Sequence, residues 1–240
     1  HTSRTPKVTL PSPPSMHFWR LNQGIDSSVY ADTRSYFDDL AAVYREEIAA
    51  LAAAGATYVQ LDDVPFPMLC DPAVQAQVRD AGLDPQQLLQ DYIKLCNDCV
   101  RDKPDGVTTA IHLCRGNYKG QFLSEGGYDA IAESFFNDLD FDAFFLEYDN
   151  PRSGDFSPLR HVPAGKYVVL GIVSSKTPEL ETPDDLKRRI DDAAAHLDLD
   201  QLCLSPQCGF ASTIAGNPVT VDDEKAKLSL VVETAAAVWG

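Results

Sequence analysis

The chain has 240 residues, of which 44% are hydrophobic, and a formal net charge of −16 at pH 7 with a pI near 4.5. A chain of this length can bury one substantial core, so we expect a single domain over residues 1–240. The acidic charge argues against binding to nucleic acid or to an anionic membrane surface, because both would repel it.

Strand-like and helical segments alternate along the chain. Short runs rich in β-branched and aromatic residues predict strands at residues 7–10, 57–61, 107–113, 143–148, 167–173 and 202–204. Helical patterns cover residues 33–53, 85–101, 128–138, 183–196 and 221–239. Strand, helix and strand at this spacing predict βαβ units and a parallel sheet. No apolar run approaches the roughly 20 residues that span a bilayer, and no signal-peptide pattern opens the chain, which favours the cytosol.

The fold class that we predict is α/β, a TIM-type (β/α)8 barrel of which this chain holds about six βα units. A closed barrel of this type needs eight strands. The chain starts with a polar lead and without Met, so we expect the first one or two units to be missing and the domain to be N-terminally incomplete. An open, doubly wound sheet is the competing interpretation.

Four side chains of the types that bind metals lie at or just after the carboxyl ends of predicted strands. They are His112 and Cys114 in AIHLCRG, Glu147 in FFLEYD, and Cys208 in LSPQCGF. If these strands belong to one parallel sheet, the four side chains gather at the edge where α/β barrels place their chemistry. Two thiolates, an imidazole and a carboxylate form a suitable zinc shell, and zinc deprotonates an added thiol. The pattern therefore indicates alkylation of sulfur at a zinc site.

Several longer motifs point the same way. In chain order they are YREEIAALAAAGATYVQLDD, the His-x-Cys of IHLCRGN, the glutamate of LEYDNPRS, and SPQCGF. Together they resemble the catalytic barrel of cobalamin-independent methionine synthases and its short single-barrel relatives, within the uroporphyrinogen decarboxylase and methionine synthase-like superfamily. The resemblance implies that His112, Cys114, Glu147 and Cys208 bind a catalytic zinc and that Asp62 holds the amino group of homocysteine. Asp63 stands where the family more usually has Glu.

One departure from the family bears on the methyl donor. The methionine synthases carry a histidine in an I-H-S-P-R-I-P stretch that helps to protonate the departing folate nitrogen, and Val173 stands at that position here. General acid help of this kind is worth about 10²–10⁴-fold. The resemblance therefore implies a donor that needs less help, such as a methyl-corrinoid. The short relatives also include enzymes that open epoxides with the thiol of coenzyme M.

The resemblance and the strand-end positions together assign roles to individual residues. We expect catalytic roles for Asp62 and Glu147, and substrate binding by Asp62, Asp63, Arg115, Asn117 and Ser174. A sulfonate-bearing acceptor would depend more on Arg115, Arg152 and Lys176. The expected partners are a small-molecule thiol acceptor and a methyl or alkyl donor, with a second copy of the chain or a corrinoid protein as candidate macromolecular partners.

Other interpretations of the same residues remain open. Glu147 could form a salt bridge with Arg152, Cys208 could be a turn residue, and Asp62 and Asp63 could cap their loop. Two rival functions follow, a non-catalytic zinc-binding barrel and a metal-free barrel enzyme such as a decarboxylase. Cys96 and Cys99 form a CxxC within a helical pattern, which favours a packing role over a second metal site.

Overall fold

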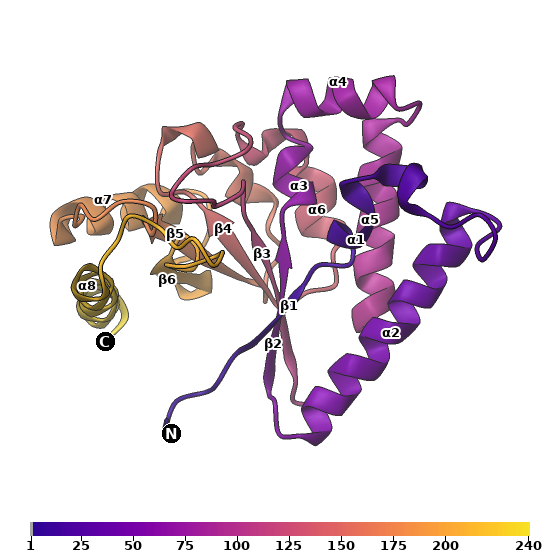
Figure 1. The fold of residues 1–240 in the computed structure, drawn as a ribbon. Coiled ribbons are helices and arrows are strands. Elements are labelled where there is room, and N and C mark those ends of the chain that lie inside the picture. The colour runs from indigo at the N-terminus through magenta and orange to yellow at the C-terminus, as the bar shows by residue number, and fades with distance from the viewer. Residues whose placement is uncertain (1) are drawn as a thin grey trace.

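A computed structural model describes residues 2–240 as a parallel sheet with helices packed against it (Figure 1). The sheet has six strands in the order of the sequence. They are β1 (Val8–Pro11), β2 (Tyr58–Asp63), β3 (Thr108–Leu113), β4 (Ala143–Glu147), β5 (Tyr167–Val173) and β6 (Leu202–Pro206). Every neighbouring pair is parallel, which confirms the predicted α/β class and its six strands.

The strand order distinguishes between the two predicted architectures. A doubly wound sheet reverses its strand order at a switch point, whereas this sheet runs from β1 to β6 without reversal. Because the crossovers between parallel strands are right-handed, an unreversed order keeps the helices on one face of the sheet. This is barrel-type winding, and it excludes the doubly wound interpretation. Within residues 2–240, β1 and β6 are the two edges of the sheet. That one or two further βα units complete the barrel stays a prediction.

Four long helices begin at side-chain caps that the sequence supplies. They are α2 (Thr33–Ala53), α5 (Pro85–Val100), α7 (Pro183–Ala194) and α8 (Val221–Trp239), which begin after Asp32, Asp84, Thr182 and Thr220 respectively. In each case the cap side chain accepts a hydrogen bond from a backbone N–H of the first turn, which satisfies a group that the helix leaves unpaired. These helices lie within two residues of the predicted ranges.

The remaining helices are short. They are α1 (Ser15–Phe18), α3 (Pro65–Met68), α4 (Pro72–Asp80) and α6 (Ala132–Asp138), with 3₁₀ turns at Leu21–Gly24, Tyr128–Ala130, Pro151–Ser153, Ser157–His161 and Leu199–Gln201. The predicted helix over 128–138 is thus a 3₁₀ turn followed by α6. No helix within residues 2–240 is both long enough and apolar enough to cross a membrane.

The core lies between the sheet and its helices. Aromatic rings connect the layers, with Phe135 of α6 packing edge-on against Phe66 of α3 at a centroid distance of 5.0 Å and tilted against Phe144 of β4 at 5.5 Å. Cys96 and Cys99 of α5 are at most 1% exposed and belong to this core. The two cysteines of the CxxC therefore pack in the core, as predicted from their position within a helix.

His17 of α1 is buried in the core, and its protonation should affect stability. Burial lowers the pKa of His17 below its ordinary value of 6.5. Its Nδ1 hydrogen-bonds the Tyr92 hydroxyl at 2.8 Å and its Nε2 the Asn22 amide oxygen at 3.0 Å. Because the unfolded chain then binds more protons than the folded chain below pH 6.5, the stability from neutral His17 is lost as the pH falls through that value.

We therefore expect the free energy of unfolding to drop between pH 7 and pH 5.5, with a slope of at most about 1.4 kcal/mol per pH unit from this group. Urea titrations of the parent and of His17→Gln across that range measure the effect. The difference in the free energy of unfolding between the parent and His17→Gln should shrink as the pH falls. A difference that stays constant would contradict the role of neutral His17 in stability.

Candidate functional site

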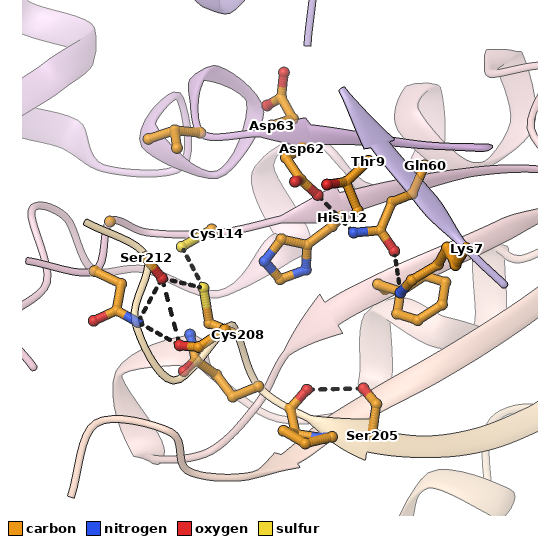
Figure 2. A pocket seen from close by; sticks show the side chains of 17 residues that line it. Lys7, Thr9, Gln60, Asp62, Asp63, His112, Cys114, Ser205, Cys208 and Ser212 are labelled. Carbon is orange, nitrogen blue, oxygen red and sulfur yellow. Dashed lines mark hydrogen bonds between the residues drawn. The ribbon is translucent and has the colours of Figure 1, made fainter. Parts of the chain in front are cut away.

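A pocket with a volume of about 620 Å³ lies against one face of the sheet (Figure 2). Its wall includes Asp62 of β2, His112 of β3, Cys114 directly after β3, and Cys208 two residues after β6. In the sheet register Asp62 lies beside His112. Parallel pairing thus brings these four side chains together at the carboxyl edge, as the strand-end positions of His112, Cys114 and Cys208 predicted.

Three of the four predicted metal ligands form a tight cluster. The ligand atoms of His112, Cys114 and Cys208 all lie within 4.8 Å of one another, and the two sulfurs are 3.7 Å apart. Two sulfurs bound to one tetrahedral zinc at about 2.3 Å each stand about 3.8 Å apart. Nε2 of His112 is buried and has no hydrogen-bond partner among the described residues. An imidazole nitrogen without a partner beside two correctly spaced sulfurs fits a soft divalent ion such as zinc.

The two thiols share protons unequally. The hydrogen bond between the two sulfurs holds the pKa of Cys208 far below its usual range. The same hydrogen bond and its burial raise the pKa of Cys114. Cys208 is therefore the more readily ionised of the two sulfurs, and the thiolate is the form that ligates metals.

The fourth predicted ligand, Glu147, is not part of this cluster. Its fully buried carboxylate pairs with Arg152 and lies 3.4 Å from the Lys176 ammonium, while its second oxygen accepts the backbone N–H of Arg115 at 2.7 Å. Glu147 ends β4 next to the end of β3, so the backbone brings it close to Cys114. Its side chain nevertheless faces two cations, and the alternative pairing with Arg152 is present as a buried ion pair.

A buried charge network surrounds Glu147. Asp149 accepts a hydrogen bond from Arg152 at 3.0 Å and one from the Ser174 hydroxyl at 2.8 Å. Nε and Nη1 of Arg152 are buried without a partner among the described residues. Burial, together with the nearby Arg115 guanidinium, lowers the pKa of Arg152 to about 10. Arg152 is therefore still charged at neutral pH, and it depends on the two carboxylates.

The predicted substrate-binding residues divide between the pocket and the interior. Asp62, Asp63 and Asn117 line the pocket. Arg115 and Ser174 do not, because their side chains are held by protein groups: Arg115 donates to the Gly126 carbonyl and the Tyr128 hydroxyl, and Ser174 donates to Asp149.

Asp63 and Asn117 also have structural partners. Asp63 is fully buried, and its carboxylate accepts the Phe66 N–H at 2.8 Å. Asn117 donates to the Gly209 carbonyl at 3.2 Å and to the Ser212 hydroxyl at 3.0 Å. Since Ser212 contacts the Cys208 sulfur at 3.4 Å, Asn117 holds the loop that carries Cys208.

Sequence reasoning missed several residues on the pocket wall, three of which interact with one another. Lys7 directly before β1, Gln60 of β2 and Phe145 of β4 line the pocket, and Figure 2 shows Lys7 and Gln60 on the side of His112 away from the two sulfurs. Lys7 and Gln60 are linked by a hydrogen bond of 2.7 Å, and the Lys7 ammonium lies 4.0 Å from the centre of the Phe145 ring. The spacing of Gln60 and Asp62 at alternate strand positions could have indicated a shared face.

Barrel-type winding and a cluster of two sulfurs and one imidazole at the carboxyl edge of the sheet define an α/β protein with a candidate site for a soft metal. The family model of the cobalamin-independent synthase catalytic domain matches residues 25–236. The chain belongs to this family.

Relatives and solved structures agree with this assignment. The uncharacterized protein YxjH of Bacillus subtilis is 45% identical over 98% of this chain, and a methionine synthase of Pyrococcus abyssi is 26% identical over 85%. The chain spans only 62% and 50% of the lengths of these two relatives.

A Listeria monocytogenes structure assigned as a vitamin-B12-independent methionine synthase superimposes with a TM-score of 0.75 at 32% identity, covering 100% of this chain and 66% of that one. A B12-independent methionine synthase from Shewanella sp. W3-18-1, in complex with selenomethionine, gives 0.70 at 21% identity over 99% of this chain and 63% of that one. The second likeness concerns the fold alone.

Proposed function

We propose that this protein transfers a methyl group, or another small alkyl group, to the thiol of homocysteine at a zinc site formed by His112, Cys114 and Cys208. The observation that carries the proposal is the 3.7 Å pair of sulfurs beside an unpartnered His112 nitrogen, at the edge of the pocket that Asp62 also lines. Membership of the cobalamin-independent synthase family supports methyl transfer as the reaction class.

The pocket has a place for each end of such an acceptor. A zinc ion at the cluster would supply Lewis acidity that keeps the acceptor thiol ionised near neutral pH. The half-buried Asp62 carboxylate offers the counter-charge for an ammonium group. In the reaction the acceptor sulfur bonds to the methyl carbon, the bond between that carbon and the donor breaks, and its electron pair leaves with the donor. The pocket wall would hold the acceptor in position for the transfer.

The donor that we propose is not a folate. Val173 at the end of β5 is fully buried and has no proton to give to a departing nitrogen. If the donor is a methyl-corrinoid, free or carried by a partner protein, the demethylated corrinoid leaves with the electron pair of the carbon–cobalt bond and needs no proton. We propose the cytosol as the compartment, because free thiols that bind a metal survive best where thiols are kept reduced.

For Glu147 we propose a ligand that the acceptor thiol displaces, with the two cysteines and the histidine as the constant set. Its pairing with Arg152 and Lys176 supports this, because the two cations stabilise a carboxylate that is off the metal. Zinc-edge X-ray absorption with and without homocysteine tests the idea. An unchanged number of sulfur ligands on addition of homocysteine would contradict it.

The pocket favours an amino-acid acceptor over a sulfonate. Arg115, Arg152 and Lys176, the cations expected to bind a sulfonate, do not line it. Those of their donors that have partners are directed to the Gly126 carbonyl and to the carboxylates of Glu147 and Asp149. Epoxide opening by coenzyme M therefore has less support than homocysteine methylation.

The activity test uses zinc-loaded protein with homocysteine and, in separate reactions, methylcobalamin and 5-methyltetrahydrofolate, with methionine measured by mass spectrometry. We expect methionine from the corrinoid and at least about 100-fold less from the folate. Turnover of coenzyme M with an epoxide, and none of homocysteine, would replace the proposal with the sulfonate alternative. A zinc-bound protein inactive with every pair would leave the non-catalytic alternative.

A further inference from the structure

A chain of hydrogen bonds runs along the pocket wall from β1 to the predicted amine-binding carboxylate. The Lys7 ammonium donates to the amide oxygen of Gln60 at 2.7 Å, and the Gln60 amide nitrogen donates to Oδ1 of Asp62 at 2.5 Å. Figure 2 shows the three side chains in this order, beside His112. Gln60 and Asp62 project from the same face of β2, because they are two residues apart on one strand.

The chemistry of the three groups fixes the direction of this chain. An ammonium can only donate, so Lys7 selects the Gln60 rotamer whose oxygen faces it. The amide nitrogen must then face Asp62, where it donates to one carboxylate oxygen. Oδ2 of Asp62 has no hydrogen-bond partner among residues 2–240 and remains available to a ligand in the pocket.

Gln60 also keeps two opposite charges apart. Without it, the Lys7 ammonium could reach Asp62 directly and neutralise the carboxylate that a substrate ammonium would use. The Phe145 ring holds Lys7 in place, with the ammonium 4.0 Å from the ring centre. Gln60 is 6% exposed, so its amide is not free to turn toward bulk water.

We propose that Gln60 and Lys7 are positioning residues that make the pocket selective for thiols bearing a primary ammonium group. Lys7 orients the Gln60 amide, and Gln60 orients Asp62 and keeps it unpaired. This inference rests on the proposed function, since it assumes that Asp62 binds the amine of the acceptor. It adds two specificity residues outside the predicted metal and substrate set.

The test compares homocysteine with 4-mercaptobutanoate, which has the same thiol and carboxylate but no amino group. For Gln60→Leu, we expect the ratio of kcat/KM for the two thiols to fall by about 10- to 100-fold, the range for one hydrogen bond to a charged group. The fall in the ratio should come from a higher KM for homocysteine. Lys7→Met should lower the ratio by several-fold, and Lys7→Arg should restore it because arginine also only donates.

Calorimetric titration of both thiols provides a readout independent of turnover. Tyr58→Phe is the matched control, because Tyr58 lies on the same face of β2 and its hydroxyl has no hydrogen bond to Asp62. Lys7 lies at an exposed position, so its variants remain informative if Gln60→Leu fails to fold.

If the parent discriminates between the two thiols and Gln60→Leu and Lys7→Met keep its ratio, the positioning inference is overturned. If the parent alkylates neither thiol, or binds both equally, the proposed function or the role of Asp62 fails instead.

Discussion

Replacing Cys208 with serine is expected to lower the affinity for zinc by more than about 100-fold, which exceeds the loss from altering an outer-shell partner. A serine hydroxyl is a harder and more weakly acidic ligand than a thiol, and it removes one of the two sulfurs that stand 3.7 Å apart. Zinc per chain, measured by mass spectrometry after dialysis against a weak chelator, should fall from near one to near zero. Methyl transfer should fall with it.

Two further variants show whether this loss is specific. Cys114→Ser should behave like Cys208→Ser, because the two sulfurs belong to the same cluster. Cys203→Ala is the matched control, since Cys203 lies on β6 within five residues of Cys208 but outside the cluster. Equal zinc loss in the control would point to general unfolding, and full zinc retention in both serine variants would refute the site.

The sequence predicted the fold well where local and tertiary preferences agree. The strand over 167–173 and the helix over 221–239 match β5 and α8 at both ends. Thr220 and Asp223 form a capping box that marks the start of α8, and β5 is an apolar run buried from its second residue to its last. Helices α1, α3 and α4 escaped prediction because they begin at or just after prolines and are too short for a clear apolar period.

The part of the site that could be predicted from the sequence consists of the side chains whose positions are determined by the ends of strands. His112, Cys114 and Cys208 could be brought together because parallel pairing fixes where the carboxyl ends of strands lie. The direction of Arg115 could not be predicted, because the loop after Cys114 turns at Gly116, whose φ of +92° favours glycine. A Cβ at Gly116 would stand 2.7 Å from the Leu123 side chain, so the loop path depends on contacts distant in sequence. The ion-pair partners of Glu147 could not be predicted for the same reason, because Arg152 lies in the loop between β4 and β5 and Lys176 in the turn after β5.

Replacing Glu147 with glutamine is expected to destabilise zinc-free protein by about 3–5 kcal/mol, as for a buried ion pair that loses one partner. In the ion pairs of this network the carboxylates of Glu147 and Asp149 match the cations of Arg152 and Lys176, whose side chains are at most 5% exposed. Glu147→Gln leaves two buried cations with one carboxylate. Urea unfolding in the presence of a chelator measures the loss without a contribution from metal binding.

The second substitution in this network should reverse the effect of the first. Arg152→Met in the Glu147→Gln background leaves Lys176 and Asp149 as a balanced pair, so we expect it to raise the free energy of unfolding, although Arg152→Met alone lowers it. Asp192→Asn is the surface control: its ion pair with Arg188 is more than half exposed, and its loss should cost no more than about 1 kcal/mol. Additive losses in the double variant would contradict the charge balance.

The same Glu147→Gln variant separates the two roles of the carboxylate. If His112, Cys114 and Cys208 form the constant ligand set, the variant should be less stable yet still hold close to one zinc per chain, unlike Cys208→Ser. Loss of zinc together with unchanged stability of the zinc-free protein would show the reverse, that Glu147 serves the metal and not the charge network. Because the two measurements respond to different partners of one side chain, they assign its function without a structure of the zinc-bound protein.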